Sequence, residues 1–112
     1  MKIKVYEAAM LSRTLAGIDL KEAQDMADTI VDIFVELLPA TREYDAALTA
    51  FQKDAQGKSQ EEAKNLVSAQ AFEKIANDTT DVEIGLEIGQ IKAIGKHLRS
   101  VADIALLYNL KQ

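Results

Sequence analysis

The 112-residue sequence has no cysteine and only one histidine, and this limits the metal and redox chemistry open to it. Without cysteine the chain can form neither disulfide bonds nor thiolate metal sites. One imidazole alone does not complete the ligand shell of a transition metal. We therefore expect no metal ion and no other cofactor.

Long apolar runs are also missing. No segment approaches the roughly 18 consecutive apolar residues of a membrane-spanning helix. The first residues, Met1-Lys2-Ile3-Lys4-Val5-Tyr6, lack the apolar stretch of a signal peptide. The sequence therefore predicts a cytoplasmic protein without membrane contact.

The composition is that of one folded domain. Hydrophobic residues make up 48% of the chain and charged residues 28%. A chain of this length buries roughly two-thirds of its unfolded surface, which is enough for one core. Because no repeat, low-complexity tract or linker divides it, residues 1–112 are predicted to form a single domain.

Charge is unevenly distributed along the chain, whose net charge is −5. Residues 19–87 carry sixteen acidic and six basic side chains, whereas residues 88–112 carry four basic and one acidic side chain. An acidic chain disfavours general binding to nucleic acid. Only the C-terminal segment has a charge suited to phosphate groups.

Two segments have the alternating pattern of β-strands. In residues 2–6, Ile3 and Val5 lie on one face and lysines on the other, and residues 81–88 alternate apolar side chains with acidic ones. Opposite charges across a strand pair contribute about 0.2–1 kcal/mol each. We therefore expect residues 2–6 and 82–87 to pair as a two-stranded ribbon.

The remaining segments have helical spacing. Capping-box patterns begin at Asp19 and Ser59, and Ser100 has the same spacing to Asp103. The predicted helices are 7–16, ending at Gly17, then 20–55, 59–76, a short helix or loop at 90–96, and 101–110. In the long helix, Val31, Ile33 and Val35 widen the apolar face, so burial on more than one side is expected.

Pro39, the only proline, leaves two alternatives for the segment 20–55. A proline inside a helix removes a backbone hydrogen bond and costs about 3 kcal/mol, so two helices could abut near residue 39. The apolar register continues beyond it, which favours one kinked helix. The predicted fold class is α+β and predominantly α, with a long helical hairpin, a C-terminal helix and a small two-stranded β-ribbon.

Three short stretches carry a resemblance to known proteins. They are Met1-Lys2-Ile3-Lys4, Ala71-Phe72-Glu73-Lys74 and the alternating segment Asp81-Val82-Glu83-Ile84-Gly85-Leu86-Glu87-Ile88. With its order of strand, short helix, long hairpin, acidic strand and C-terminal helix, the chain resembles a family of small phage and prophage proteins of unknown function. The resemblance implies a similar architecture and a phage-related context, and it assigns no functional residues.

Acidic side chains spaced three or four apart form a stripe on the long helix. They are Glu22, Asp25, Asp28, Asp32 and Glu36. Helical carboxylate metal centres need histidines on facing helices, which this chain does not supply. The stripe is therefore interpreted as a solvated face, with a partner surface as the alternative.

Two segments imitate catalytic motifs without meeting their requirements. His97, Ser100 and Asp103 are spaced by three, but a triad needs the imidazole between hydroxyl and carboxylate, and Ser100 is explained as a helix cap. The segment from Gly89 to His97 has five residues between its glycines and a histidine after the lysine, whereas a phosphate loop has four and a serine or threonine. An enzyme is therefore not expected.

The length of the predicted helix suggests an interaction protein. A compact domain of this size is about 34 Å across, whereas a helix over 20–55 would be about 54 Å long. A second copy or a partner helix would then cover the candidate partner surface of Tyr44, Leu48 and Phe51. We therefore expect a non-enzymatic interaction or assembly protein that forms a homo-oligomer or binds another protein.

The alternative function is a small regulatory DNA-binding protein. It would use a basic patch to contact phosphates. The patch consists of Lys92, Lys96, His97 and Arg99.

Overall fold

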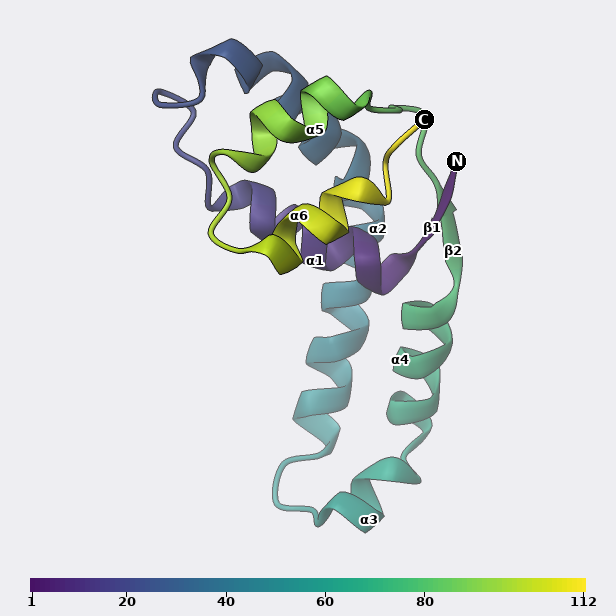
Figure 1. The fold of residues 1–112 in the computed structure, drawn as a ribbon. Coiled ribbons are helices and arrows are strands. Elements are labelled where there is room, and N and C mark those ends of the chain that lie inside the picture. Colours follow the sequence, from purple (N-terminus) through teal and green to yellow (C-terminus); the bar gives the residue numbers. More distant parts are fainter.

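The computed structural model describes residues 1–112 and consists mainly of helices (Figure 1). The elements in chain order are β1 (Lys2–Lys4), α1 (Val5–Ala16), a 3-10 helix η1 (Gln24–Met26), α2 (Ala27–Asp54), α3 (Gln60–Lys64), α4 (Val67–Asn77), β2 (Thr79–Asp81), α5 (Ile88–Gly95) and α6 (Val101–Tyr108). The predicted α+β, predominantly α class is confirmed.

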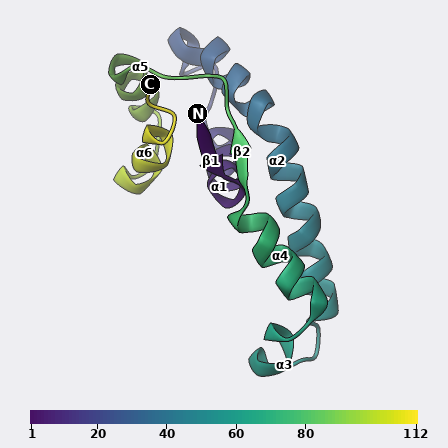
Figure 2. The same ribbon diagram turned by 90° about the vertical axis from the view of Figure 1, so that its right-hand side faces the viewer.

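The core lies between layers of helices. Figure 2 shows α1 and the β-ribbon in the middle, with α2 on one side and α5 and α6 on the other. Apolar side chains from all these layers are fully buried, among them Leu11, Ile33, Leu37, Ile94 and Leu107. The core therefore joins segments from both ends of the sequence.

The second half of α2 extends away from these layers, α3 lies at its far end, and α4 folds back along it (Figure 1). This is the predicted helical hairpin. We call residues 45–75 the arm and the rest of the chain the head. The molecule measures 48 × 26 × 22 Å, so it is elongated, in contrast to the compact shape assumed in the length argument.

The long helix runs unbroken through Pro39, as the continuing apolar register indicated, but it begins at Ala27 and not near residue 20. The Asp19 carboxylate accepts a hydrogen bond from the Lys21 amide at 2.9 Å, and this local bond holds a turn in place of a first helical turn. The missing amide of residue 39 would have donated to the carbonyl of Val35, which lies on the exposed face. A carbonyl without a hydrogen-bond partner costs less free energy at this exposed position, where water can bind it, than in the core.

The third predicted helix is divided into α3 and α4. Its start is as expected, because the Ser59 hydroxyl accepts from the Glu62 amide at 3.2 Å. The side-chain amide of Asn65 donates to the Glu61 carbonyl at 3.1 Å and so takes up an acceptor of the last turn. Leu66 then adopts an extended conformation before α4 begins.

The ribbon is antiparallel and shorter than predicted. Lys2 lies opposite Asp81 and Lys4 opposite Thr79, so the expected facing of lysine and carboxylate occurs at one position only. The prediction for residues 82–87 was wrong, since they form no strand with residues 2–6. The Glu7 carboxylate accepts from the Lys4 amide at 3.0 Å and starts α1 at Val5, which shortens the first strand.

The segment after β2 pairs instead with the end of the chain. The Leu86 amide donates to the Leu110 carbonyl at 2.7 Å, and the Gln112 amide donates to the Leu86 carbonyl at 3.0 Å. A Cβ at Gly85 would lie 2.3 Å from the Gln112 side chain, so this exposed side chain would have to move aside if residue 85 were not glycine. Leu86 thus pairs with the C-terminal residues, whereas the prediction had paired its segment with residues 2–6.

Candidate interaction surfaces

The candidate partner surface on α2 lies largely under α4. Tyr44 is only 8% exposed, and its ring centre is 5.1 Å from that of Phe72. The ring of Phe51 also stacks on Phe72, with 6.3 Å between centres, and Leu48 is half-buried. The inference that Tyr44 faces a partner is therefore corrected, because the chain covers it itself by folding back.

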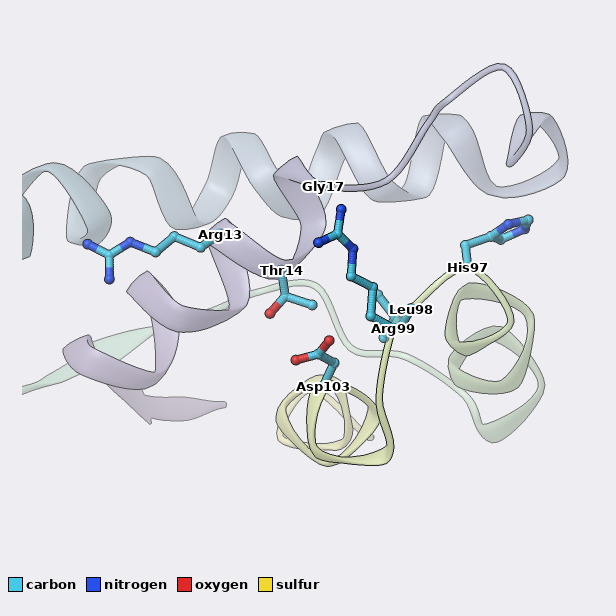
Figure 3. Close-up of a pocket in the computed structure, with 7 residues that line it drawn as sticks. All are labelled: Arg13, Thr14, Gly17, His97, Leu98, Arg99 and Asp103. Carbon is cyan, nitrogen blue, oxygen red and sulfur yellow. The ribbon is translucent and has the colours of Figure 1, made fainter.

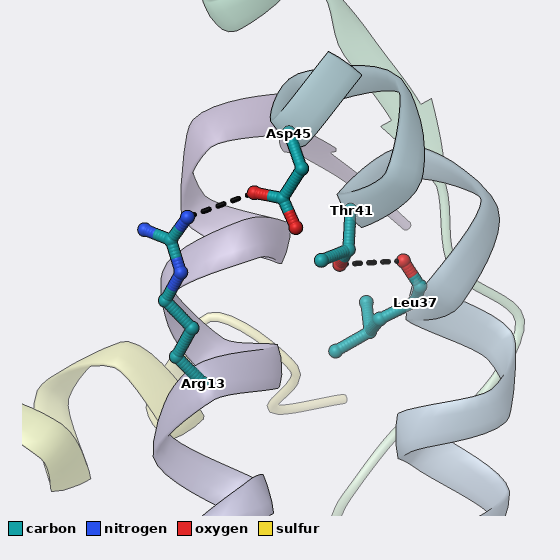
Figure 4. Close-up of polar contacts among 4 residues, drawn as sticks. All are labelled: Arg13, Leu37, Thr41 and Asp45. Carbon is teal, nitrogen blue, oxygen red and sulfur yellow. Dashed lines mark hydrogen bonds and ion pairs between the residues drawn. The ribbon is translucent and has the colours of Figure 1, made fainter. Parts of the chain in front are cut away.

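Arg13 of α1, in the head, also covers Tyr44. Its guanidinium lies over the Tyr44 ring at 5.6 Å and pairs with the Asp45 carboxylate at 2.8 Å (Figure 4). One helical turn away, the Thr41 hydroxyl donates to the Leu37 carbonyl at 2.9 Å. Both members of the ion pair are about half exposed, so the pair contributes at most about 1 kcal/mol. Arg13 is thus occupied in joining α1 to α2.

A different apolar surface is open between α1, the segment that follows it, and the first turns of α2. We call it the α1–α2 groove. Its volume is about 300 Å³, and every lining residue is hydrophobic: Leu15, Ala16, Ile18, Leu20, Ile30, Val31 and Phe34. Val31 is 43% exposed, and Val35, one turn further along α2, is 59% exposed. The expectation that α2 is buried on more than one side was therefore wrong at these valines.

Carboxylates border this groove along α2. Asp28 and Asp32 are exposed and lie three residues before Val31 and Val35, on neighbouring positions of the helix surface. At the ends of the acidic stripe, Glu36 accepts from the Glu83 amide and the Asp25 carboxylate lies 3.9 Å from the His97 ring. No group of three or more histidine or carboxylate side chains is placed to hold a metal ion.

The predicted basic patch does not form one continuous surface. Lys92 and Lys96 are exposed on α5, whereas His97 is turned toward Asp25. Arg99 lines a pocket of about 270 Å³ together with His97, and its guanidinium points toward Gly17 at the end of α1 (Figure 3). A phosphate backbone would not meet all four side chains on a single face.

Two of the residues that imitate a catalytic triad, His97 and Asp103, line the same pocket. The Asp103 carboxylate points toward Thr14, and His97 points away from both (Figure 3). The Ser100 hydroxyl accepts from the Asp103 amide at 3.3 Å, which is the helix cap predicted from the spacing. The three side chains therefore do not combine into a nucleophilic site.

A second apolar surface that the sequence did not indicate lies between α5 and α6. We call it the α5–α6 patch. It surrounds a depression of about 210 Å³ lined by Ile88, Ile91, Lys92 and Tyr108. Ile88 is 45% and Tyr108 53% exposed. Both surfaces depend on which helices meet in the fold, and single-helix periodicity does not contain that information.

No family model, no curated protein and no solved structure matches this chain. No helix of the structure is both long and apolar enough to cross a membrane.

Proposed function

We propose that this chain is a non-enzymatic interaction protein that assembles with further copies of itself or with a partner helix. The observation that carries the proposal is the α1–α2 groove, which is lined only by hydrophobic residues and continues into the exposed Val35. Contiguous apolar surface bordered by polar residues marks interaction sites in soluble proteins. The groove replaces the covered Tyr44 region as the surface for association.

The resemblance to small phage and prophage proteins gives this proposal a biological context. Such a context suits a short chain whose function is assembly. Genes for tail or packaging proteins beside the gene of this chain would support it, and a neighbourhood without phage genes would count against it.

DNA binding is the weaker alternative. Only Lys92 and Lys96 of the predicted patch share one exposed face, while His97 and Arg99 are directed elsewhere. Binding to DNA that weakens steeply with salt would favour this alternative. Indifference to DNA under the conditions of assembly would favour the interaction role.

Association is tested by light scattering over about two decades of protein concentration, since the population of an assembly follows mass action. We expect the average mass to rise with concentration. Val31→Asp with Val35→Asp should abolish the rise, because both side chains are exposed, Val31 lines the groove and Val35 lies one helical turn further along α2. Val67→Asp is the control, since Val67 is 83% exposed and lies outside the groove.

The partner-helix form of the proposal predicts a different result. The chain would then be monomeric alone, and a peptide helix with one apolar and one basic face would bind. Loss of that binding in the Val31 and Val35 variant, with retention in the control, would identify the groove. A chain that neither self-associates nor binds such a helix would refute the proposal.

A further inference from the structure

We infer that the occupant of the α1–α2 groove is the α5–α6 patch of a second copy, so that the chain assembles head to tail. The inference rests on the proposed assembly function and specifies which two surfaces of neighbouring copies meet. Two observations support it: matching apolar character and opposite charge.

Both surfaces expose apolar side chains around a depression. The groove presents Val31 and, next to it, Val35, while the patch presents Ile88 and Tyr108. A tyrosine that enters an apolar groove is the kind of residue that contributes most to interfaces. Each surface can therefore remove the other from water.

The charges beside the two surfaces are opposite and equally spaced. Asp28 and Asp32 are four residues apart on α2, and Lys96, the C-cap of α5 with helical dihedral angles, is four residues after Lys92. All four side chains are exposed. Residues at this spacing lie on one helix face, so two helices laid side by side can bring both lysines to both carboxylates. Glu87, an exposed carboxylate, begins α5 next to the patch and reduces its positive charge without reversing it.

The same charges disfavour the symmetric arrangement of groove on groove. In that arrangement Asp28 and Asp32 of the two copies would approach one another, and like charges across an interface are destabilising. Patch on patch would likewise bring lysines together. Groove on patch is the combination in which both the apolar and the charged groups find complements.

The two surfaces lie on different layers of the fold. Figure 2 shows α2 on one side of α1 and the pair α5 and α6 on the other. Both depressions are open in the structure, so a single molecule does not close the contact on itself. Contact between different surfaces of two copies leaves one groove and one patch free, and it continues as an open chain or closes as a ring.

The test uses two charge-reversed variants and their mixture. Asp28→Lys with Asp32→Lys makes both surfaces of one variant basic, and Lys92→Glu with Lys96→Glu makes both surfaces of the other acidic. Each variant alone should self-associate at least about tenfold more weakly than the wild type in sedimentation. The equimolar mixture should recover the assembly, because each basic surface then meets an acidic one.

A second pair of variants tests the direction of assembly. Val31→Asp with Val35→Asp removes the groove, and Ile88→Asp with Tyr108→Asp removes the patch. Mixed together, they retain one intact groove and one intact patch, so the mass should stop at a 1:1 dimer. Circular dichroism of each variant checks that the fold is retained, and Val67→Asp, which is far from both surfaces in sequence, should assemble as the wild type does.

The outcomes separate this inference from the proposed function. If the wild type assembles but either charge-reversed variant alone assembles equally well, or the mixture stays monomeric, the groove-to-patch pairing is wrong and self-assembly stands. If the wild type is monomeric at every concentration, head-to-tail assembly is refuted. Binding of a basic amphipathic peptide to that monomer would then leave the partner-helix form of the function standing.

Discussion

The head and the arm are built from the same kinds of helix, yet they differ in how much they bury. Every buried residue of the protein lies outside residues 45–75. The arm depends on half-buried side chains, chiefly Leu48 and Phe51 of α2 and Phe72 and Ile75 of α4, and the Phe51 ring stacks on that of Phe72. Regions with few buried apolar contacts open at lower free energy than the core around them. The arm should therefore open locally while the head remains folded.

This difference also separates the two roles of apolar surface in the molecule. In the arm, the apolar side chains of α2 are only partly covered by α4. They are exposed because the arm has no packed core. In the head, Val31 and Val35 are exposed next to a well-packed core. Exposure beside a rigid core is the more useful arrangement for binding, because the surface is already ordered.

The largest expected effect is in the head. Leu37→Ala removes a side chain that is 1% exposed and packed between α2 and α1. Such substitutions cost about 2–5 kcal/mol, and at this burial we expect about 3–4 kcal/mol. Urea denaturation followed by circular dichroism measures the loss. A cost below that of Leu48→Ala in the arm would contradict the distinction between the two regions.

The next effect should be confined to the arm. Phe72 contacts both Tyr44 and Phe51 and is itself half-buried, so Phe72→Ala should cost about 2 kcal/mol, less than for a fully buried ring. Hydrogen exchange should show faster exchange in α3 and α4 and little change in α1. If amides of α1 lose protection equally, the arm does not open as a separate unit.

Features set by neighbouring residues could be predicted from the sequence. Ser59 and Ser100 cap helices as expected, because a cap depends only on the next three residues. The continuous helix through Pro39 followed from the apolar register on either side. The ribbon was found in part, since Lys2 does face Asp81, but the helix that begins at Val5 shortened it.

Features set by contacts between distant segments could not be predicted in this way. Leu86 pairs with the C-terminal residues, and no periodicity within either segment specifies that partner. Tyr44 is covered because α4 returns along α2 and places Phe72 against it. The expectation of an open Tyr44 came from assuming a compact domain, whereas the molecule is elongated. The two interaction surfaces were missed for the same reason, because each is formed where separate helices meet.

A smaller effect is expected at the turn that closes the arm. Gly57 has φ of 75°, in the region that other residues adopt with strain, and nothing lies within 4 Å of an added Cβ. Gly57→Ala should therefore cost about 1 kcal/mol through the backbone alone. Gly89→Ala is the control: this helical glycine also has open space around it, and alanine there should be neutral or stabilising by up to about 1 kcal/mol. Equal effects at both positions would show that backbone conformation is not the cause.

The smallest effect concerns one hydroxyl in each region. Ser12 on α1 is 2% exposed and Ser68 on α4 is half-buried, and neither side-chain oxygen has a hydrogen-bond partner. Both substitutions to alanine gain the same few tenths of a kcal/mol in helix propensity. Ser12→Ala should gain more, because it also removes an unsatisfied polar group from the core, whereas brief opening of the arm lets water reach Ser68.

Thr41→Val provides the reference for a satisfied hydroxyl in the head. Its hydroxyl donates to the Leu37 carbonyl, so its loss should cost about 1 kcal/mol. Thermal unfolding of the three variants under one set of conditions should therefore rank them in the order Ser12→Ala, Ser68→Ala, Thr41→Val, from most to least stable. If Ser12→Ala were as destabilising as Thr41→Val, the Ser12 hydroxyl would have a partner in solution, such as a buried water. The core of the head would then be less dry than its burial indicates, and the contrast with the arm would be weaker.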